Sequence, residues 1–133
     1  MATTTHPRVH CASGSLTLAQ VNANTRVGTI IVPPAVDRTI TVVDGWLRSE
    51  GHSAGGATAV ILTETGGTPT TVVSAAVAGI TQDLIARFGA ANITATNVGT
   101  ACTKGRGLAI GCTVGNLTTS HSLDYCIYYT VTV

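Results

Sequence analysis

Hydrophobic and polar residues alternate with a period of two along most of the chain, and β-branched residues are frequent in the alternating segments. This pattern is typical of half-buried β-strands, and glycines and prolines separate the segments at the spacing of a sandwich or barrel. The fold class predicted is all-β, an antiparallel β-sandwich or jelly roll with at most one short helix. It has about eight strands, at residues 16–21, 26–32, 39–50, 57–65, 70–76, 91–97, 108–114 and 123–133.

The last predicted strand shows the alternation most clearly. Its odd-numbered residues, from Leu123 to Val133, are all apolar or aromatic, whereas the even-numbered residues from Asp124 to Thr132 are mostly polar. The odd-numbered face should line the core. We therefore expect the chain to end in a central, well-paired strand.

Residues 80–88 fit a strand less well. Ile80, Leu84 and Phe88 recur at helical spacing, although even-numbered alternation fits almost as well. Thr81 and the two residues after it resemble a helix entry, and a crossover between sheets is needed somewhere. A short helical connection is the preferred interpretation.

The first fifteen residues carry no apolar periodicity that would dock them on a core. The chain is therefore divided into an N-terminal arm, residues 1–15, and a single β-sandwich domain, residues 16–133. Polar termini fray unless something holds them, so the arm is expected to pair with another chain along a strand edge. The alternative is that it folds back on its own sheet as an edge strand. The partner-binding residues assigned to the arm are Thr3, Thr4, Thr5, His6, Arg8 and His10.

A second candidate contact surrounds the single tryptophan. Asp44, Trp46 and Arg48 share the strand parity of Ile40 and Val42, so either this face becomes exposed toward Trp46 or its charges meet a partner. Trp and Arg are common in the few residues that dominate binding energy. Trp46 and Arg48 are therefore candidate partner-binding residues. The alternative is a half-buried tryptophan that caps one end of the core.

Only 10% of the residues are charged, against about 25% in a typical soluble domain. Too few charges remain to coat a free monomer, so a homo-oligomer is expected. A net charge of +1 with one lysine, Lys104, offers no basic stripe for nucleic acid. The longest apolar runs, such as residues 59–62, are far below the roughly 20 residues that span a bilayer. Residues 1–10 contain no secretory apolar stretch, so we expect synthesis in the cytoplasm and no membrane contact.

The even number of cysteines permits disulfides, but the lack of a secretory segment argues against them. Free, mostly buried thiols are expected at Cys11, Cys102, Cys112 and Cys126. A Cys102–Cys112 bridge across a hairpin neck is the alternative.

The sequence gives little support for a metal or cofactor site. His6, His10 and Cys11 could hold zinc if Cys102, Cys112 or His121 completed a tetrahedron, but there is no Cys-x-x-Cys pair. Ordinary polar residues are the preferred interpretation, with no metal and no cofactor. The glycine-rich loop 103–107 carries Lys104 and Arg106 and could clamp a carboxylate or phosphate, yet it lacks the phosphate-loop pattern. We expect a solvated turn.

Catalysis would need clustered acids, bases or a nucleophile with its base in reach. The carboxylates are scattered along the chain. His121 and Asp124 lie near Ser120 and Ser122, but neighbours on one turn rarely form a triad. We therefore predict that the protein is not an enzyme.

The chain resembles small β-sandwich virion proteins of tailed bacteriophages in its short strands rich in Ala, Gly, Thr and Val and in its short turns. The resemblance lies in residues 38–76, including 39–48, 55–62 and 67–76, and in the closing segment 125–131. The resemblance implies a capsid decoration or cement protein, a homotrimer that binds the major capsid protein or another virion protein at the capsid surface and stabilises the head lattice. It places synthesis in the host cytoplasm. The alternative is a tail or fibre component that acts as a carbohydrate- or receptor-binding module. The resemblance transfers no functional residue.

Overall fold

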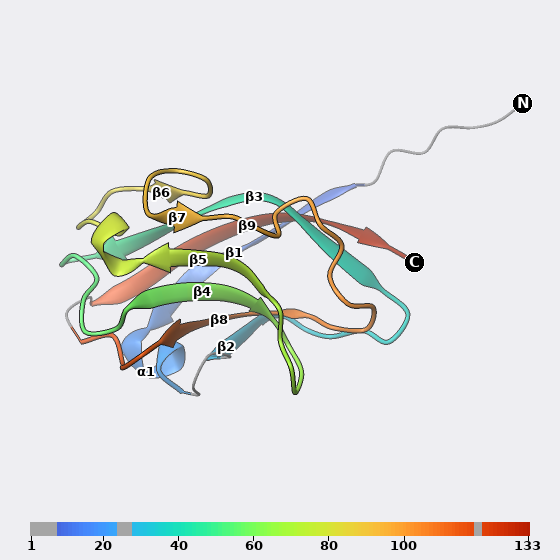
Figure 1. Ribbon diagram of the computed structural model, residues 1–133, viewed down its shortest axis with the longest axis horizontal. Coiled ribbons are helices and arrows are strands. Elements are labelled where there is room, and N and C mark those ends of the chain that lie inside the picture. The colour runs from blue at the N-terminus through green and yellow to red at the C-terminus, as the bar shows by residue number, and fades with distance from the viewer. Residues whose placement is uncertain (1–7, 24–27, 119–120) are drawn as a thin grey trace, which may run out of the picture.

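The computed structural model describes residues 8–23, 28–118 and 121–133, which form a β-sandwich of two packed sheets (Figure 1). Within those ranges one sheet has the strand order β1-β9-β3-β6 and the other β2-β8-β4-β5-β7, and every pairing between these strands is antiparallel. The all-β sandwich prediction is confirmed. The strands are β1 (Val9–Thr17), β2 (Thr29–Val32), β3 (Thr39–Glu50), β4 (Ala59–Glu64), β5 (Thr71–Ala76), β6 (Ala86–Arg87), β7 (Ile93–Thr94), β8 (Leu108–Thr113) and β9 (Ser122–Thr132).

The longest strand pair, β3 with β9, lies in the middle of the first sheet. Leu123 and Ile127 of β9 are fully buried, as the alternation predicts, and Leu47 of β3 is 1% exposed. They pack against the inner residues of the second sheet, among them Leu62 and Ile110. Apolar side chains from both sheets thus form one core between the two layers.

Strand β3 contains a bulge that changes which face its residues occupy. The register with β9 shifts between Val42 and Asp44, so Val43 has no partner across the pair. Before the bulge the even-numbered Ile40 and Val42 are buried in the core; after it Leu47 and other odd-numbered residues are. A single extra residue in a strand exchanges the two faces beyond it. The bulge therefore turns the even-numbered residues Asp44 to Arg48 outward.

Most of the sheet edges are covered. The outer edge of β3 receives backbone hydrogen bonds from Gly99 and Cys102 along its first half and from Phe88 beyond the bulge. Strand β7 is only two residues long and β2 is four residues long. Strand β1 differs: it spans nine residues and pairs on one side only, with β9. It is the longest one-sided edge in the described part of the chain.

Several expected elements differ from the structure. The strand expected at residues 16–21 is wrong, because β1 ends at Thr17 and the helical turn α1 (Leu18–Val21) follows. Thr17 and Gln20 form a capping box, in which each side chain bonds the other residue's backbone N–H. Of the strand expected at residues 91–97, only the two residues of β7 are in a strand.

The helical connection expected at residues 80–88 is also wrong. A 3₁₀ turn ends at Gly79, and the segment then contains an irregular stretch and β6. Ile80 is fully buried, but Leu84 and Ile85 are 62% and 56% exposed, so the apolar residues share no helical face. Asp83 adopts a φ of +56°, which a helix does not permit.

Among the described residues, no helix is long and apolar enough to span a membrane.

Part of the expected arm belongs to the sandwich. Residues 9–15 lie in β1 and pair with β9 from Val9 opposite Thr130 to Ser15 opposite Asp124. The edge-strand alternative therefore holds for this part, because backbone pairing along a well-formed strand supplies the restraint that apolar side chains do not. Residues 1–7 lie outside the described ranges.

Truncating Ile127 to alanine tests the central position of β9. We expect Ile127→Ala to lower the free energy of unfolding by about 2–5 kcal/mol, since it leaves a cavity in a fully packed core. Ile30→Ala is the matched control, because Ile30 is 51% exposed on β2, and it should change stability by less than about 0.5 kcal/mol. Urea denaturation measures both, and equal losses would contradict the assigned core.

Candidate partner-binding face

The outward side of the first sheet brings together an aromatic pair and two groups of charges. We name it the tryptophan face and define it by Asp44, Trp46, Arg48, Arg87, Asp124 and Tyr128. Trp46 lies opposite Cys126 on β9 and opposite Arg87 on β6, while Asp44 lies opposite Tyr128. The face is built on three adjacent strands, so its side chains are held by the sheet backbone rather than by a loop.

The two aromatic side chains are accessible. Trp46 is half-buried and Tyr128 is 37% exposed. Beside them Arg87 Nη2 lies 3.0 Å from Asp44 Oδ2, and both side chains of this ion pair are largely open to solvent. The tryptophan is thus flanked by one exposed ion pair on this side.

On the other side of Trp46 a second, better-covered group of charges is centred on Arg48. Its Nη2 lies 2.7 Å from Asp124 Oδ2 and 2.8 Å from Glu50 Oε1, and its Nε donates to Asp124 at 3.1 Å. Ser122 Oγ lies 3.1 Å from the second oxygen of Glu50. The network fixes the Arg48 guanidinium beside the tryptophan.

This network determines the ionisation of Asp124. Burial disfavours the carboxylate, but hydrogen bonds from Arg48 and Ser15 outweigh it and hold the pKa of Asp124 below its ordinary value of 3.8. The same Asp124 hydrogen bond raises the pKa of Arg48. Both groups are therefore charged at neutral pH.

Two thiols lie beside the aromatic residues on the adjacent strands, with Cys11 opposite Tyr128 and Cys126 opposite Trp46. Cys11 Sγ on β1 is 3.2 Å from Cys126 Sγ on β9, and the two residues are 115 positions apart in sequence. The hydrogen bond to Cys126, followed by burial, raises the pKa of Cys11. The hydrogen bond to Cys126 likewise raises the pKa of Tyr128. All four cysteines are free, and all but Cys11 are buried, in agreement with the expected state of the thiols.

The sequence-derived site residues fall in two different places. Trp46 and Arg48 lie together on the tryptophan face. Arg8 is exposed just before β1, and His10 belongs to the opposite side of the sheet, where it stacks on Tyr129 at 5.4 Å. Thr3, Thr4, Thr5 and His6 lie outside the described residues. Sequence reasoning missed Tyr128, although the alternation in β9 already placed it outward, and it missed Arg87, whose position depends on the two-residue strand β6.

The other candidates separate in space. Cys102 lies beside Glu64, while the Cys112 thiol donates a hydrogen bond to Asn22 Oδ1, so the two thiols do not face each other across a hairpin neck. Within the described residues no three His, Cys, Asp or Glu side chains are placed to hold a metal ion. His121 contacts the ring of His52 at 4.9 Å.

Comparisons with protein-family models, with curated proteins and with solved structures find no match to this chain.

The Arg48 network predicts a pH-dependent loss of stability on removing the Asp124 charge. The pKa of Asp124 is lower in the folded protein than its ordinary value of 3.8. The charged carboxylate therefore stabilises the fold at any pH above 3.8, and this stabilisation is lost as the pH falls through the lower pKa of the folded state. We expect Asp124→Asn to be less stable than the wild type at pH 7 and to approach it below pH ~3. Thermal melts across pH measure this, with the exposed Asp37→Asn as the control, and a pH-independent difference would contradict the assignment.

The adjacent thiols predict a specific disulfide under oxidation. Oxidised glutathione should accept two electrons and two protons from Cys11 and Cys126 and yield two reduced glutathiones, faster as pH approaches the ordinary thiol pKa of 9.0. The bond would close a long loop and stabilise the fold by about 2–4 kcal/mol. Peptide mapping and thermal melting detect it.

The control for this oxidation is Cys102→Ser. Burial and then the Glu64 carboxylate raise the pKa of Cys102 to about 11, so its thiol stays protonated and unreactive. Cys102→Ser should oxidise as the wild type does, and Cys11→Ser should not form the bond. A glutathione adduct without the internal disulfide would contradict the geometry.

Proposed function

We propose that the protein is a non-enzymatic structural module of a bacteriophage virion, a capsid decoration protein that binds the major capsid protein or another virion protein through the tryptophan face. It is made in the host cytoplasm and resides at the capsid surface. The proposal joins the resemblance of the strands to small virion proteins with the composition of this face.

The observation that carries the proposal is the placement of Trp46. A partly exposed tryptophan lies between an ion pair and a charged network, on adjacent strands of one sheet. Interfaces obtain most of their binding energy from a few aromatic and Arg side chains with a polar rim. Because the strands hold these groups in place, little conformational entropy is lost when a partner covers them.

The edge of β1 supports self-association in the same proposal. A one-sided strand of nine residues offers backbone donors and acceptors that another strand can use. It contains neither Lys nor Pro, the residues that commonly block pairing at an edge. The homotrimer that the resemblance implies would have a suitable contact here.

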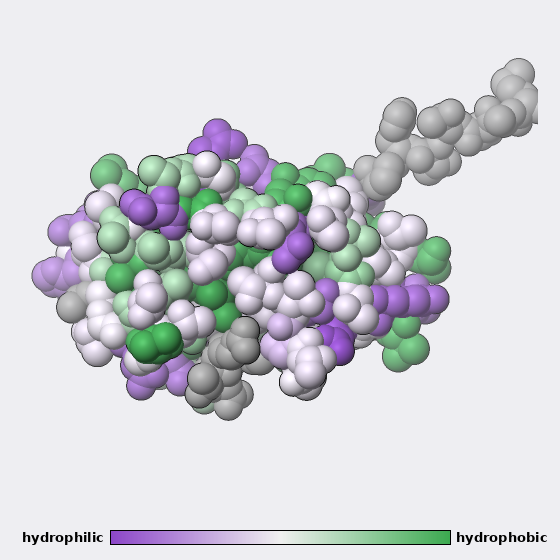
Figure 2. Space-filling model, in the orientation of Figure 1, coloured by the Kyte–Doolittle hydropathy of each residue, from purple (hydrophilic) through white to green (hydrophobic). Residues whose placement is uncertain are grey.

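The alternative of a carbohydrate-binding module fits the second sheet less well. A shallow groove of ≈ 480 Å³ on that sheet is lined by hydroxyl-bearing and small apolar residues, among them Thr71, Ser74, Thr94 and Thr96. The surface over β4 and β5 is correspondingly pale in Figure 2, with the most hydrophilic residues mainly near the rim. The groove lining has hydroxyls for a sugar but no aromatic ring on which the sugar could stack, so the decoration proposal is favoured.

Binding to particles assembled without the protein tests the proposal. We expect the purified protein to bind such particles and raise their disassembly temperature. Trp46→Ala should weaken binding by about 30-fold, the equivalent of a hot spot of about 2 kcal/mol. Arg87→Ala, on the same face and away from the core, should weaken it to a smaller extent.

Val36→Ala is the matched control for this binding experiment. Val36 is 90% exposed in the loop before β3 and is not part of the tryptophan face. It should bind particles as the wild type does. Absence of the protein from purified virions would overturn the virion assignment, whereas full binding by both Trp46→Ala and Arg87→Ala would overturn the face and leave the virion assignment standing.

A further inference from the structure

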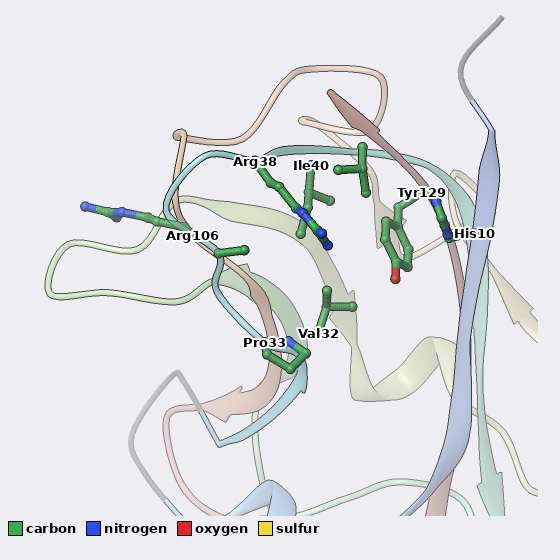
Figure 3. A pocket seen from close by; sticks show the side chains of 9 residues that line it. His10, Val32, Pro33, Arg38, Ile40, Arg106 and Tyr129 are labelled. Atoms are coloured by element: carbon green, nitrogen blue, oxygen red, sulfur yellow. The ribbon is translucent and has the colours of Figure 1, made fainter. Parts of the chain in front are cut away.

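A pocket of ≈ 100 Å³ opens at the end of the sandwich, on the inner side of the first sheet and away from the tryptophan face. Its apolar lining comes from both sheets: Val32 is the last residue of β2 and Pro33 follows it, while Ile40 and Val131 belong to β3 and β9 (Figure 3). A side chain on Gly107 would collide with the backbone from Val32 to Pro34. This glycine lets the chain that enters β8 pack closely against the chain that leaves β2, beside the pocket.

Two arginines lie at the pocket, and only one is available to a ligand. Arg106 points away from the pocket in Figure 3, and its Nη1 lies 3.4 Å from buried Glu64 and 2.9 Å from the carbonyl of Thr68. Arg38 points into the pocket, and it forms no ion pair with any residue the structure describes. The pocket therefore holds one uncompensated guanidinium.

The wall opposite Arg38 is a stacked pair of rings. His10 and Tyr129 are 5.4 Å apart with an interplanar angle of 21°, and the Tyr129 hydroxyl points into the pocket (Figure 3). A phenol hydroxyl and an imidazole N–H are both hydrogen-bond donors. Three different donor groups thus surround an apolar floor.

We propose that this pocket binds a carboxylate carried on a short aliphatic group. The guanidinium fork matches the two oxygens of a carboxylate, and Tyr129 and His10 can donate to the same oxygens. The floor formed by Val32, Ile40 and Val131 receives the aliphatic part. A cavity of 150 Å³ holds benzene, so ≈ 100 Å³ fits a group of the size of propionate. This group is a free short-chain acid or the side chain of a glutamate in a partner.

Titration of the protein with propionate and with acetyl-Ala-Glu-Ala-amide tests the proposal and separates the two sources. Backbone amide NMR should show saturable shifts at His10, Arg38 and Val131, with a Kd in the millimolar range, because a ligand of so few atoms makes few contacts. Tighter binding of the peptide would assign a partner's side chain, and tighter binding of propionate a free acid. Propionamide, which has the same shape and no charge, should not bind.

Substitutions separate this site from general attraction to positive charge. Arg38→Gln should weaken binding at least tenfold, and Tyr129→Phe should weaken it severalfold. Lys104→Gln removes the same charge from the neighbouring loop and should leave the Kd unchanged, and all three variants should melt as folded proteins. Absence of saturable binding by both probes, or equal affinity of Arg38→Gln and the wild type, would overturn the proposal.

Discussion

The pairing of β3 with β9 is the interaction on which the rest of this structure depends. It is the longest pairing in the described chain, and each of the two strands has one face toward the core and one on the outer side of the sheet. Strand β9 holds β1 on its other side, and β3 holds β6. Without this pair the first sheet would have neither an inner face to cover the second sheet nor an outer face to present Trp46.

The two candidate surfaces are assembled from neighbouring residues of the same strands. Tyr128 faces outward beside Trp46, and the next residue, Tyr129, faces inward and lines the pocket. On β1, His10 lies against Tyr129 on the inner side, while Cys11 contacts Cys126 on the outer side. Because successive strand residues point to opposite sides, one strand pair supports two chemically different sites. The polar outer face and the small cationic pocket are therefore separated by the thickness of one sheet.

The sequence predicts the long strands well and the short or irregular elements poorly. The expected range 39–50 coincides with β3, and the strong alternation of β9 identifies both its faces. Alternation did not identify the bulge at Val43, because its only mark is that the charged Asp44 and Arg48 share the parity of Ile40 and Val42, which an exposed strand end explains equally well. Residues 9–15 of β1 were not predicted as a strand, because Ser13, Gly14 and Ser15 have weak strand propensity and backbone pairing with β9 determines their conformation.

Of the candidate site, the sequence identified Trp46 and Arg48 but not what surrounds them. Cross-strand partners are set by register, which pairs Arg48 with a residue 76 positions away, Asp124. The unpaired state of Arg38 depends on the same long-range information, since only the fold shows that the acidic partner Glu64 is taken by Arg106. Local motifs carry no signal for either arrangement.

The position of β1 also determines how the sandwich responds to mechanical force. Val9 lies opposite Thr130, so the first residue of β1 and the last residues of β9 are at the same end of the sheet. Tension between them would open the β1–β9 hydrogen bonds one pair after another, as a zipper opens, rather than shearing the whole strand at once. Strands that separate one hydrogen-bonded pair at a time come apart at low force. A covalent bond between Cys11 and Cys126, near the end where opening starts, would arrest it and transfer the load to the body of the fold.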